Sequence, residues 1–353
     1  MTLEHDDILV TKHDSDDDVS WDAFVEDHEH ATLYHSTGWQ RVITDVFRKE
    51  TYYLRAEDSN RRILGVLPLV RLGGWLDGKR LVSIPYCNYG GELAAAPQVR
   101  EALERSALSL ASKLGVESIE LRRRLPMAMS AVWQERLDKV VMKLPLAAGS
   151  DELWSQLGSK LRAQIKRPLR EGALVMHGGV KLIPAFYGVF CENMRDLGTP
   201  VYPRQFFESV AQHMSDRVHV ILVNLGDATV AACFLLSYRD TLEIPWASSL
   251  RRYNSLGINM LLYWEALKFA ADSGYALFDF GRCTKGGGTH RFKAQWGATC
   301  QQLHWWSWSQ RPTDECPVGD TEDKHRMMRA LWRTLPLAIA NRLGPRVTSN
   351  LPW

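Results

Sequence analysis

Three β-rich runs lie close together between residues 218 and 249, and they restrict the fold more than any other feature. They read VHVILVNL, TVAACFLLSY and TLEIPWASS, and only the short polar turns GDA and RD separate them. Turns this short join antiparallel neighbours, because a parallel connection needs a dozen or more residues. The sequence therefore predicts an antiparallel meander.

The elements that follow the meander have a recognisable order. We expect a largely buried helix in NMLLYWEALKFAADSG, a strand in YALFDF, a short helix at 289–296 and a last strand in CQQLHWWSW. Three antiparallel strands, a helix, a strand, a short helix and a final strand form the element order of the GNAT acyltransferase fold.

The first half of the chain repeats this order with different residues. TYYLRAE, RILGVLPLVRL and RLVSIPY read as strands, PQVREALERSALSLASKLG as a helix between Pro97 and Gly115, and SIELRRR as a strand. A chain of 353 residues is long enough for two domains. We therefore predict an α/β (α+β) protein with tandem GNAT-type folds, in which mixed, largely antiparallel sheets are flanked by helices.

The expected domain boundaries follow from this repeat. Residues 1–145 with 318–353 form the first predicted domain, and residues 146–317 form the second, which we expect to carry catalysis. The C-terminal stretch MMRALWRTLPLAIANRLG is helical and is interrupted at Pro336. It either docks onto the first domain or lies on a membrane surface, because Arg329, Arg333 and Arg342 accompany Trp332 and several leucines.

Composition sets the broad class of protein. The net charge of +2 and hydrophobic content of 45% describe a globular chain rather than a disordered or strongly nucleic-acid-like one. The acidic start lacks the features of a signal peptide, so we expect a flexible N-terminal end and a cytoplasmic location, with the inner face of the membrane as an alternative. The six cysteines form no metal-ligand spacing, and the HEH cluster at 28–30 lacks HExxH spacing, so no metal site is predicted.

The stretch FDFGRCTKGGGTHRFKAQWGA contains the densest group of candidate site residues. It is no P-loop, because Lys285 precedes the glycines instead of following them. Gly286, Gly287 and Gly288 allow a ligand to approach the main chain closely, which suits the rim of a donor or anion site. A mobile surface connector is the competing interpretation.

A second candidate is the basic cluster KLRAQIKRPLR. On a helix, Arg162, Lys166 and Arg170 fall four residues apart and form a cationic stripe beside an apolar one. This stripe is either a solvated face or an anchor for phosphates or another polyanion.

Several motifs together resemble the FemAB-related acyltransferases, in the branch associated with PEP-CTERM/exosortase systems of exopolysaccharide-producing bacteria. They are HSTGWQRVI, LVSIPYCNYGG, SKLRAQIKRPLREG, NMRDLGTPVYP, EIPWASSLRRYN, NMLLYWEAL, FDFGR and HRFKAQWGA, and they extend from about residue 34 to the C-terminal helix. The resemblance implies two GNAT-type domains. It also implies transfer of an aminoacyl or acyl group from an activated donor to an amine, with formation of an amide bond.

The donor and acceptor stay open at this point. In the better-known relatives the donor is aminoacyl-tRNA and the acceptor is a peptide amine on a cell-wall precursor, whose counterpart here would be a cell-envelope or polysaccharide precursor. The helical arm of those enzymes has no obvious counterpart in this sequence. Acyl-CoA as co-substrate, with a small-molecule or sugar amine as acceptor, is the alternative, although RCTKGGGTH does not match the spacing R/Q-x-x-G-x-G/A of the usual GNAT pyrophosphate loop. A non-catalytic scaffold that binds a polysaccharide or protein is a third hypothesis.

Acyl-transfer chemistry, together with the resemblance, suggests roles for individual residues. Lys293, which matches the family's FK motif, would stabilise the negative charge that develops on the carbonyl oxygen; the alternative is a lysine that caps a turn. Asp279 would act as a general base, hold the amine or anchor its loop, and Arg282 would pair with Asp279 or with a substrate carboxylate or phosphate. No metal is required. The candidates for substrate binding are Arg195, Tyr202, Trp246, Ser248, Arg251, Tyr253, Asn259 and Trp296. Trp246 is equally well explained as a core residue, because an aromatic side chain in a strand usually packs.

Overall fold

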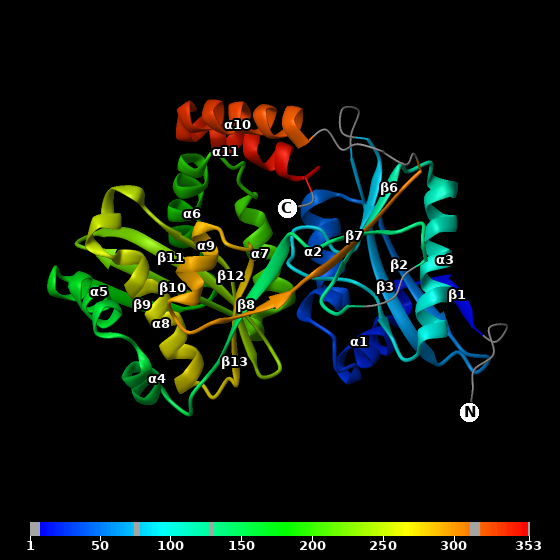
Figure 1. Ribbon diagram of the computed structural model, residues 1–353, viewed down its shortest axis with the longest axis horizontal. Coiled ribbons are helices and arrows are strands. Elements are labelled where there is room, and N and C mark those ends of the chain that lie inside the picture. The colour runs from blue at the N-terminus through cyan, green and yellow to red at the C-terminus, as the bar shows by residue number, and fades with distance from the viewer. Residues whose placement is uncertain (1–7, 74–77, 127–129, 311–317, 352–353) are drawn as a thin grey trace. The chain divides into compact units, whose positions relative to one another are not determined.

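The computed structural model describes residues 8–73, 78–126, 130–310 and 318–351. The chain divides into two compact units, one made of Met1–Lys139, Gln302–Glu315 and Ser349–Trp353, the other of Val140–Gln301 and Cys316–Thr348. Each unit contains one mixed sheet flanked by helices (Figure 1). The predicted fold class is therefore confirmed. Cys316 and the predicted boundary at residue 317 lie outside the described residues.

The first unit is built on a sheet whose strands are mostly antiparallel. In spatial order they are β1 (Leu9–Lys12), β2 (Thr51–Glu57), β3 (Ile63–Leu72), β4 (Arg80–Val82), β6 (Ser118–Arg123), β15 (His304–Ser309) and β7 (Gln134–Arg136), and β5 (Leu93–Ala94) also pairs with β3. The helices of this unit are α1 (Asp18–Asp27), α2 (Thr37–Phe47) and α3 (Pro97–Leu114). Helix α3 begins at Pro97 and is capped after Leu114 by Gly115, whose φ of +58° is left-handed, as the sequence predicts.

The second unit contains the predicted meander at the centre of a seven-stranded sheet. The strand order is β14 (Thr299–Gln302), β8 (Lys139–Pro145), β13 (Leu277–Thr284), β12 (Thr241–Ser249), β11 (Ala228–Tyr238), β10 (Val218–Leu225) and β9 (Ala173–Gly178). Strands β9 to β12 pair in antiparallel fashion, whereas β12 and β13 are parallel.

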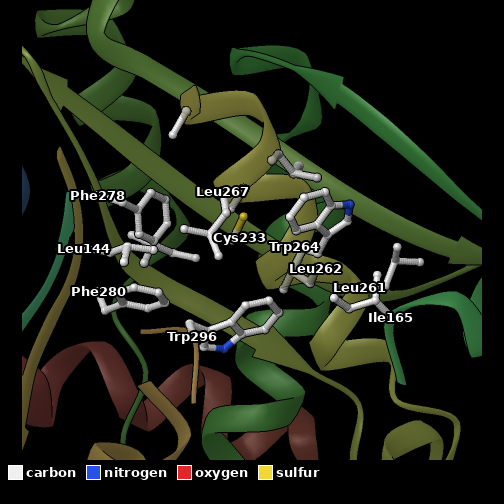
Figure 2. Packing of buried hydrophobic residues seen from close by; sticks show 14 of the residues in the cluster. Leu144, Ile165, Cys233, Leu261, Leu262, Trp264, Leu267, Phe278, Phe280 and Trp296 are labelled. Atoms are coloured by element: carbon white, nitrogen blue, oxygen red, sulfur yellow. The ribbon is translucent and has the colours of Figure 1, made fainter. Parts of the chain in front are cut away.

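Helices cover both faces of this sheet, which explains why β11 is apolar almost throughout. One face carries α4 (Ser150–Gln156), α5 (Ser159–Arg170) and α8 (Ile258–Asp272); the other carries α6 (Ile183–Leu197) and α7 (Arg204–His213). Cys233 packs with Leu267 and Trp264 under α8, as Figure 2 shows. The next residue, Phe234, lies on the opposite face, with its ring 5.4 Å from that of Phe207.

The N-terminal prediction of a flexible end is wrong for the residues that the structure describes. After β1 the chain forms a 3₁₀ turn at Ser15–Asp17 and enters α1 at Asp18. Asp17 pairs with buried Arg55, and Asp18 pairs with Arg41 and accepts a hydrogen bond of 2.8 Å from Nε2 of His13. The acidic run is therefore ordered because it meets cations from neighbouring elements and supplies carboxylates to a helix N-terminus.

The predicted last strand, CQQLHWWSW, is divided between the two sheets. β14 pairs in the second unit, whereas β15 pairs with β6 and β7 in the first. Trp306 and Trp308 pack against the core of the first unit, and Trp305 lies on the other side of the strand, where the guanidinium of Arg122 is 4.5 Å from its ring. The alternating tryptophans therefore fit β15 to the first sheet on both faces.

The C-terminal helices also differ from the predicted assignment to the first domain. α10 (Val318–Thr334) and α11 (Leu337–Thr348) belong to the second unit and both contact α6 (Figure 1). Oγ1 of Thr348 donates a hydrogen bond to the carbonyl of Val201, and Arg195 donates to the carbonyl of Leu335. Only Ser349–Trp353 return to the first unit. No helix among the described residues is long and apolar enough to cross a membrane.

Two helical glycines test the docking of α11. A Cβ at Gly344 would lie 2.8 Å from the main-chain nitrogen of Val201, whereas one at Gly188 in α6 would meet nothing within 4 Å. Alanine gains helix propensity at both positions. We expect Gly188→Ala to raise the free energy of unfolding by about 0.5–1 kcal/mol and Gly344→Ala to lower it by about 1–3 kcal/mol, as measured by urea denaturation. An equal gain in both variants would contradict the contact between α11 and Val201.

Candidate functional site

The sheet of the second unit opens between two adjacent strands. β12 and β13 pair at three positions, from Thr241–Leu277 to Glu243–Asp279. Beyond Glu243, β12 stays paired with β11 up to Ser249, while β13 continues to Thr284 without further pairing to β12. Main-chain donors and acceptors at such an opening need other partners, from side chains or from a ligand.

Asp279 and Lys293 fix the main chain of β13 where the strands part. Oδ1 of Asp279 accepts a hydrogen bond of 2.7 Å from the main-chain nitrogen of Gly281, whose φ of +73° is left-handed. Nζ of Lys293, on α9 (Gly288–Ala294), donates to the carbonyl oxygens of Gly281 and Arg282, both at 2.9 Å. Asp279 is 3% exposed and Lys293 is 4% exposed. We call these four residues the β13 clasp.

The β13 clasp is also a charge cluster. Glu243, a residue that was not among the predicted site residues, is buried and lies directly opposite Asp279 in the strand register. Burial lowers the pKa of the Lys293 ammonium below its ordinary value of 10.5, and the neighbouring Cys283, Asp279 and Glu243 act in the opposite direction. The sequence signal for Glu243 is an acidic residue inside the otherwise apolar strand stretch LEIPW.

A pocket of about 340 Å³ lies at the end of β12, where the chain enters α8. Gly257 begins α8 with a φ of +80°, and a Cβ there would lie 3.0 Å from the carbonyl oxygen of Gln164. The N-cap residue, Gly257, has no side chain with which to cap this helix, which leaves a favourable position for an anion. The residues that line the pocket come from α5, the β12–α8 connection, α8 and α9: Gln164, Arg167, Ser249, Asn254, Ser255, Leu256, Gly257, Asn259, Met260 and Phe292.

The predicted anion-binding residues do not line this pocket. Arg167 and Gln164 line it from α5, whereas the predicted stripe occupies neighbouring positions, with Nζ of Lys166 placed 5.4 Å from the ring of Trp154. None of the three stripe residues lines the pocket: Arg162, Lys166 and Arg170. The glycine loop, Lys285 with Gly286, Gly287 and Gly288, forms the turn from β13 into α9.

Three of the predicted substrate-binding residues are engaged in packing. Trp246 meets Phe207 edge-on at 5.2 Å, and Tyr202 packs on Phe206 in the same aromatic cluster. Oγ of buried Ser248 accepts a hydrogen bond of 3.1 Å from Asn193. These side chains hold the α6–α7 face of the sheet together.

The other predicted substrate-binding residues lie in different places. Arg195 pairs with Asp196 at 2.7 Å near the C-terminal helices. Arg251 is exposed and Tyr253 is half-buried, both in the β12–α8 connection, and Asn259 lines the pocket. Trp296 is 3% exposed and packs near Phe280 (Figure 2), while its indole N–H has no acceptor among the described residues. Of the substrate-binding candidates, the structure brings Asn259 into the pocket.

Comparison with known proteins identifies the fold. Residues 159–294 match the model of an acetyltransferase (GNAT) domain. The crystal structure of FemX is similar with a TM-score of 0.65 at 12% identity, over 91% of this chain and 100% of that one. A tandem GNAT protein from the clavulanic acid biosynthesis pathway gives 0.59 at 10% identity, over 87% and 100%. L-PGS from Bacillus licheniformis gives 0.58 at 13% identity, over 92% and 98%. No curated protein matches the chain.

These similarities confirm two of the predictions. The units form a tandem GNAT-like arrangement, and the matched domain supports the predicted enzyme class, an acyltransferase. GNAT enzymes use acyl-CoA as co-substrate. The matched domain contains both the β13 clasp and the pocket.

The β13 clasp can be tested through stability. In Lys293→Met the carbonyls of Gly281 and Arg282 lose a charged donor, so we expect the free energy of unfolding to fall by about 1.5–3 kcal/mol. The matched control Lys285→Met, at an exposed position, should change it by less than about 0.5 kcal/mol. Equal stability of the two variants in chemical denaturation would contradict a structural role for Lys293.

The pH dependence gives a second readout of the same substitution. Because the folded-state pKa of Lys293 is lowered, the unfolded chain holds the proton over a range of pH in which the folded chain has lost it. Stability contributed by this group therefore rises as the pH increases toward 10.5 and is lost as the pH falls through the folded-state pKa. We therefore expect the unfolding free energy of the wild type, relative to that of Lys293→Met, to increase as the pH rises from the folded-state pKa of Lys293 toward 10.5.

Proposed function

We propose that the second unit transfers an acyl group from acyl-CoA to a primary amine and forms an amide bond. The observation that carries this proposal is the position of the pocket at the end of β12, beside the strand opening. A donor whose phosphates lie in the pocket can extend its thioester along the unpaired edge of β12. The amine then meets the thioester carbonyl within the opening.

The pocket has the chemistry that the donor's phosphates require. Arg167 supplies a guanidinium, which is suited to bidentate hydrogen bonds with phosphate oxygens. Asn254 and Asn259 add amide donors, and the uncapped start of α8 adds main-chain N–H groups. Gly257 keeps the main chain accessible because any larger residue would be strained at its φ of +80°.

The reaction requires stabilisation of an oxyanion. The amine nitrogen attacks the thioester carbonyl, the tetrahedral intermediate carries negative charge on oxygen, and the C–S bond breaks to release the CoA thiolate. An ammonium has three N–H donors, and two of those on Lys293 bind the carbonyls of Gly281 and Arg282. We assign the third to the oxyanion. Asp279 accepts a hydrogen bond from the main chain of Gly281 and so stabilises the β13 clasp. We therefore assign the amine proton to water as its acceptor.

The first unit contains a similar strand opening, but its own chain fills it. Parallel strands β4 and β6 also pair at three positions only. Beyond them, the main-chain nitrogens of Gly90 and Gly91 donate to the carbonyl of Arg122, and Ser83 accepts from the nitrogen of Arg122. The guanidinium of Arg122 donates to the carbonyl of Cys87. This arrangement supports placement of the donor in the second unit.

An aminoacyl donor carried by tRNA is the second candidate. The motif resemblance to the FemAB-related acyltransferases suggests it, and α5 presents an exposed cationic surface beside the pocket. A cell-envelope or polysaccharide precursor as acceptor, and a setting in PEP-CTERM/exosortase biology, follow from the motif resemblance alone. A non-catalytic scaffold is disfavoured by the matched acetyltransferase domain.

The donor assignment predicts selective stabilisation. We expect acetyl-CoA or a longer acyl-CoA to raise the melting temperature of the wild type, because a ligand that binds only the folded state stabilises it by about 2.7 kcal/mol at a hundredfold excess over Kd. Arg167→Gln should raise the Kd for acyl-CoA about tenfold or more, since it removes a charged hydrogen bond. Titration calorimetry of the wild type and of Arg167→Gln measures the two Kd values for acyl-CoA.

Arg170→Gln provides the matched control. Arg170 lies on the same helix, is exposed and does not line the pocket. The Kd of the Arg170→Gln variant for acyl-CoA should therefore match that of the wild type. No stabilisation by any acyl-CoA, together with preferential binding of charged over uncharged tRNA, would replace acyl-CoA with the aminoacyl donor. An equal loss of affinity for acyl-CoA in Arg167→Gln and Arg170→Gln would contradict the assignment of the pocket to the donor.

A further inference from the structure

The two C-terminal helices expose large apolar side chains on the surface of the second unit. Met327 and Leu331, one turn apart on α10, are 70% and 66% exposed, and Met328 is 60% exposed. On α11, Ile339 and Leu343 are 46% and 39% exposed and also lie one turn apart. Apolar side chains that gather on one surface indicate a binding surface, whereas single exposed ones do not.

Arginines are interspersed with these apolar residues. The exposed arginines of the two helices are Arg326, Arg329, Arg333, Arg342 and Arg346. From Lys324 to the C-terminus the sequence contains no aspartate or glutamate. We call the five apolar residues and the five arginines the C-terminal face.

The packing of α11 fixes which of its sides belongs to the C-terminal face. Ala340, Gly344 and Thr348 are buried four residues apart, with Gly344 and Thr348 against Val201. Ile339 and Leu343 are therefore held on the outer side together with the arginines at positions 342 and 346. Figure 1 shows α10 and α11 on the outside of α6.

We propose that the C-terminal face docks on the surface of an anionic lipid bilayer. Helices that lie in a membrane interface insert apolar side chains at the level of the headgroups, and cations beside them bind anionic lipid. Among the described residues, neither helix is long and apolar enough to span a bilayer.

Charge favours a lipid surface over the other occupants. A second copy of this chain, related by two-fold symmetry, would bring these arginines against the same arginines, which is unfavourable. A nucleic acid would bind the arginines through its phosphates but would gain little from Met327, Leu331 or Ile339. Anionic lipid matches both the charge and the apolar side chains.

Docking here would affect the second unit at a defined place. A Cβ at Gly198, the residue that ends α6, would lie 2.5 Å from the carbonyl oxygen of Arg329 on α10. Arg333 also donates to the carbonyl of Leu197. The α6–α7 loop therefore lies directly against α10, and a bilayer that binds α10 would lie near this loop.

The test is flotation of the full-length protein with vesicles of phosphatidylcholine alone or mixed with phosphatidylglycerol. We expect binding to the mixed vesicles only, weakened by added salt. Arg329→Gln combined with Arg342→Gln should reduce the partition coefficient about fivefold for each arginine. Met327→Gln combined with Leu331→Gln should reduce it about tenfold or more.

Two exposed positions elsewhere serve as controls. Leu174→Gln on β9, where the side chain is 69% exposed, and Arg62→Gln in the first unit should bind the vesicles like the wild type. Unchanged thermal unfolding of all variants excludes misfolding as the cause. Equal binding to both vesicle types, or no effect of the C-terminal variants, would overturn the proposal. So would a dimer in sedimentation that these variants abolish, or displacement of the vesicles by tRNA at a low molar ratio.

Discussion

The arrangement of the second unit depends on two hydrogen bonds from one buried lysine. Lys293 binds the carbonyls of Gly281 and Arg282 where β13 leaves its partner β12. Main-chain groups inside a sheet cannot stay unpaired without a cost of about 1–3 kcal/mol each. The lysine satisfies two of them and Asp279 satisfies a third, so the strands can part. The motifs FDFGR and HRFK thus act together, although seven residues separate them.

The short helix α9 connects the β13 clasp to the pocket. Phe292 lines the pocket and meets Tyr263 edge-on at 4.8 Å, while the next residue, Lys293, holds β13. Tyr263 also stacks near Phe280, which follows Asp279 on β13. The pocket and the strand opening therefore share an aromatic contact, and under the proposed function the same packing would position the donor and fix the opening. A substitution at Lys293 would change activity through this packing as well as through its chemistry.

Local sequence signals predicted the elements well, whereas partners in space could not be predicted. Pro97 and Gly115 mark both ends of α3, and the short turns of the meander give its antiparallel pairing. Periodicity indicates which residues share a helix face but not what covers that face. For this reason the sequence predicts the stripe that contains Lys166 as the anion site, whereas the neighbouring residue Arg167 is the one that lines the pocket. Likewise, nothing local in CQQLHWWSW marks the point at which the chain passes from one sheet to the other.

The two units show how one fold can have different roles. Both have parallel strands that pair at three positions and then part. In the first unit the segment SIPYCNYGG occupies the opening, with Ile84 and Tyr86 at φ values of +52° and +70°. Such conformations cost about 1–3 kcal/mol each and persist only where the surroundings over-determine them. Buried Arg122 supplies those surroundings by binding the carbonyl of Cys87. The first unit thus bonds its opening with its own main chain, whereas the proposed function requires the second unit to keep its opening for a ligand.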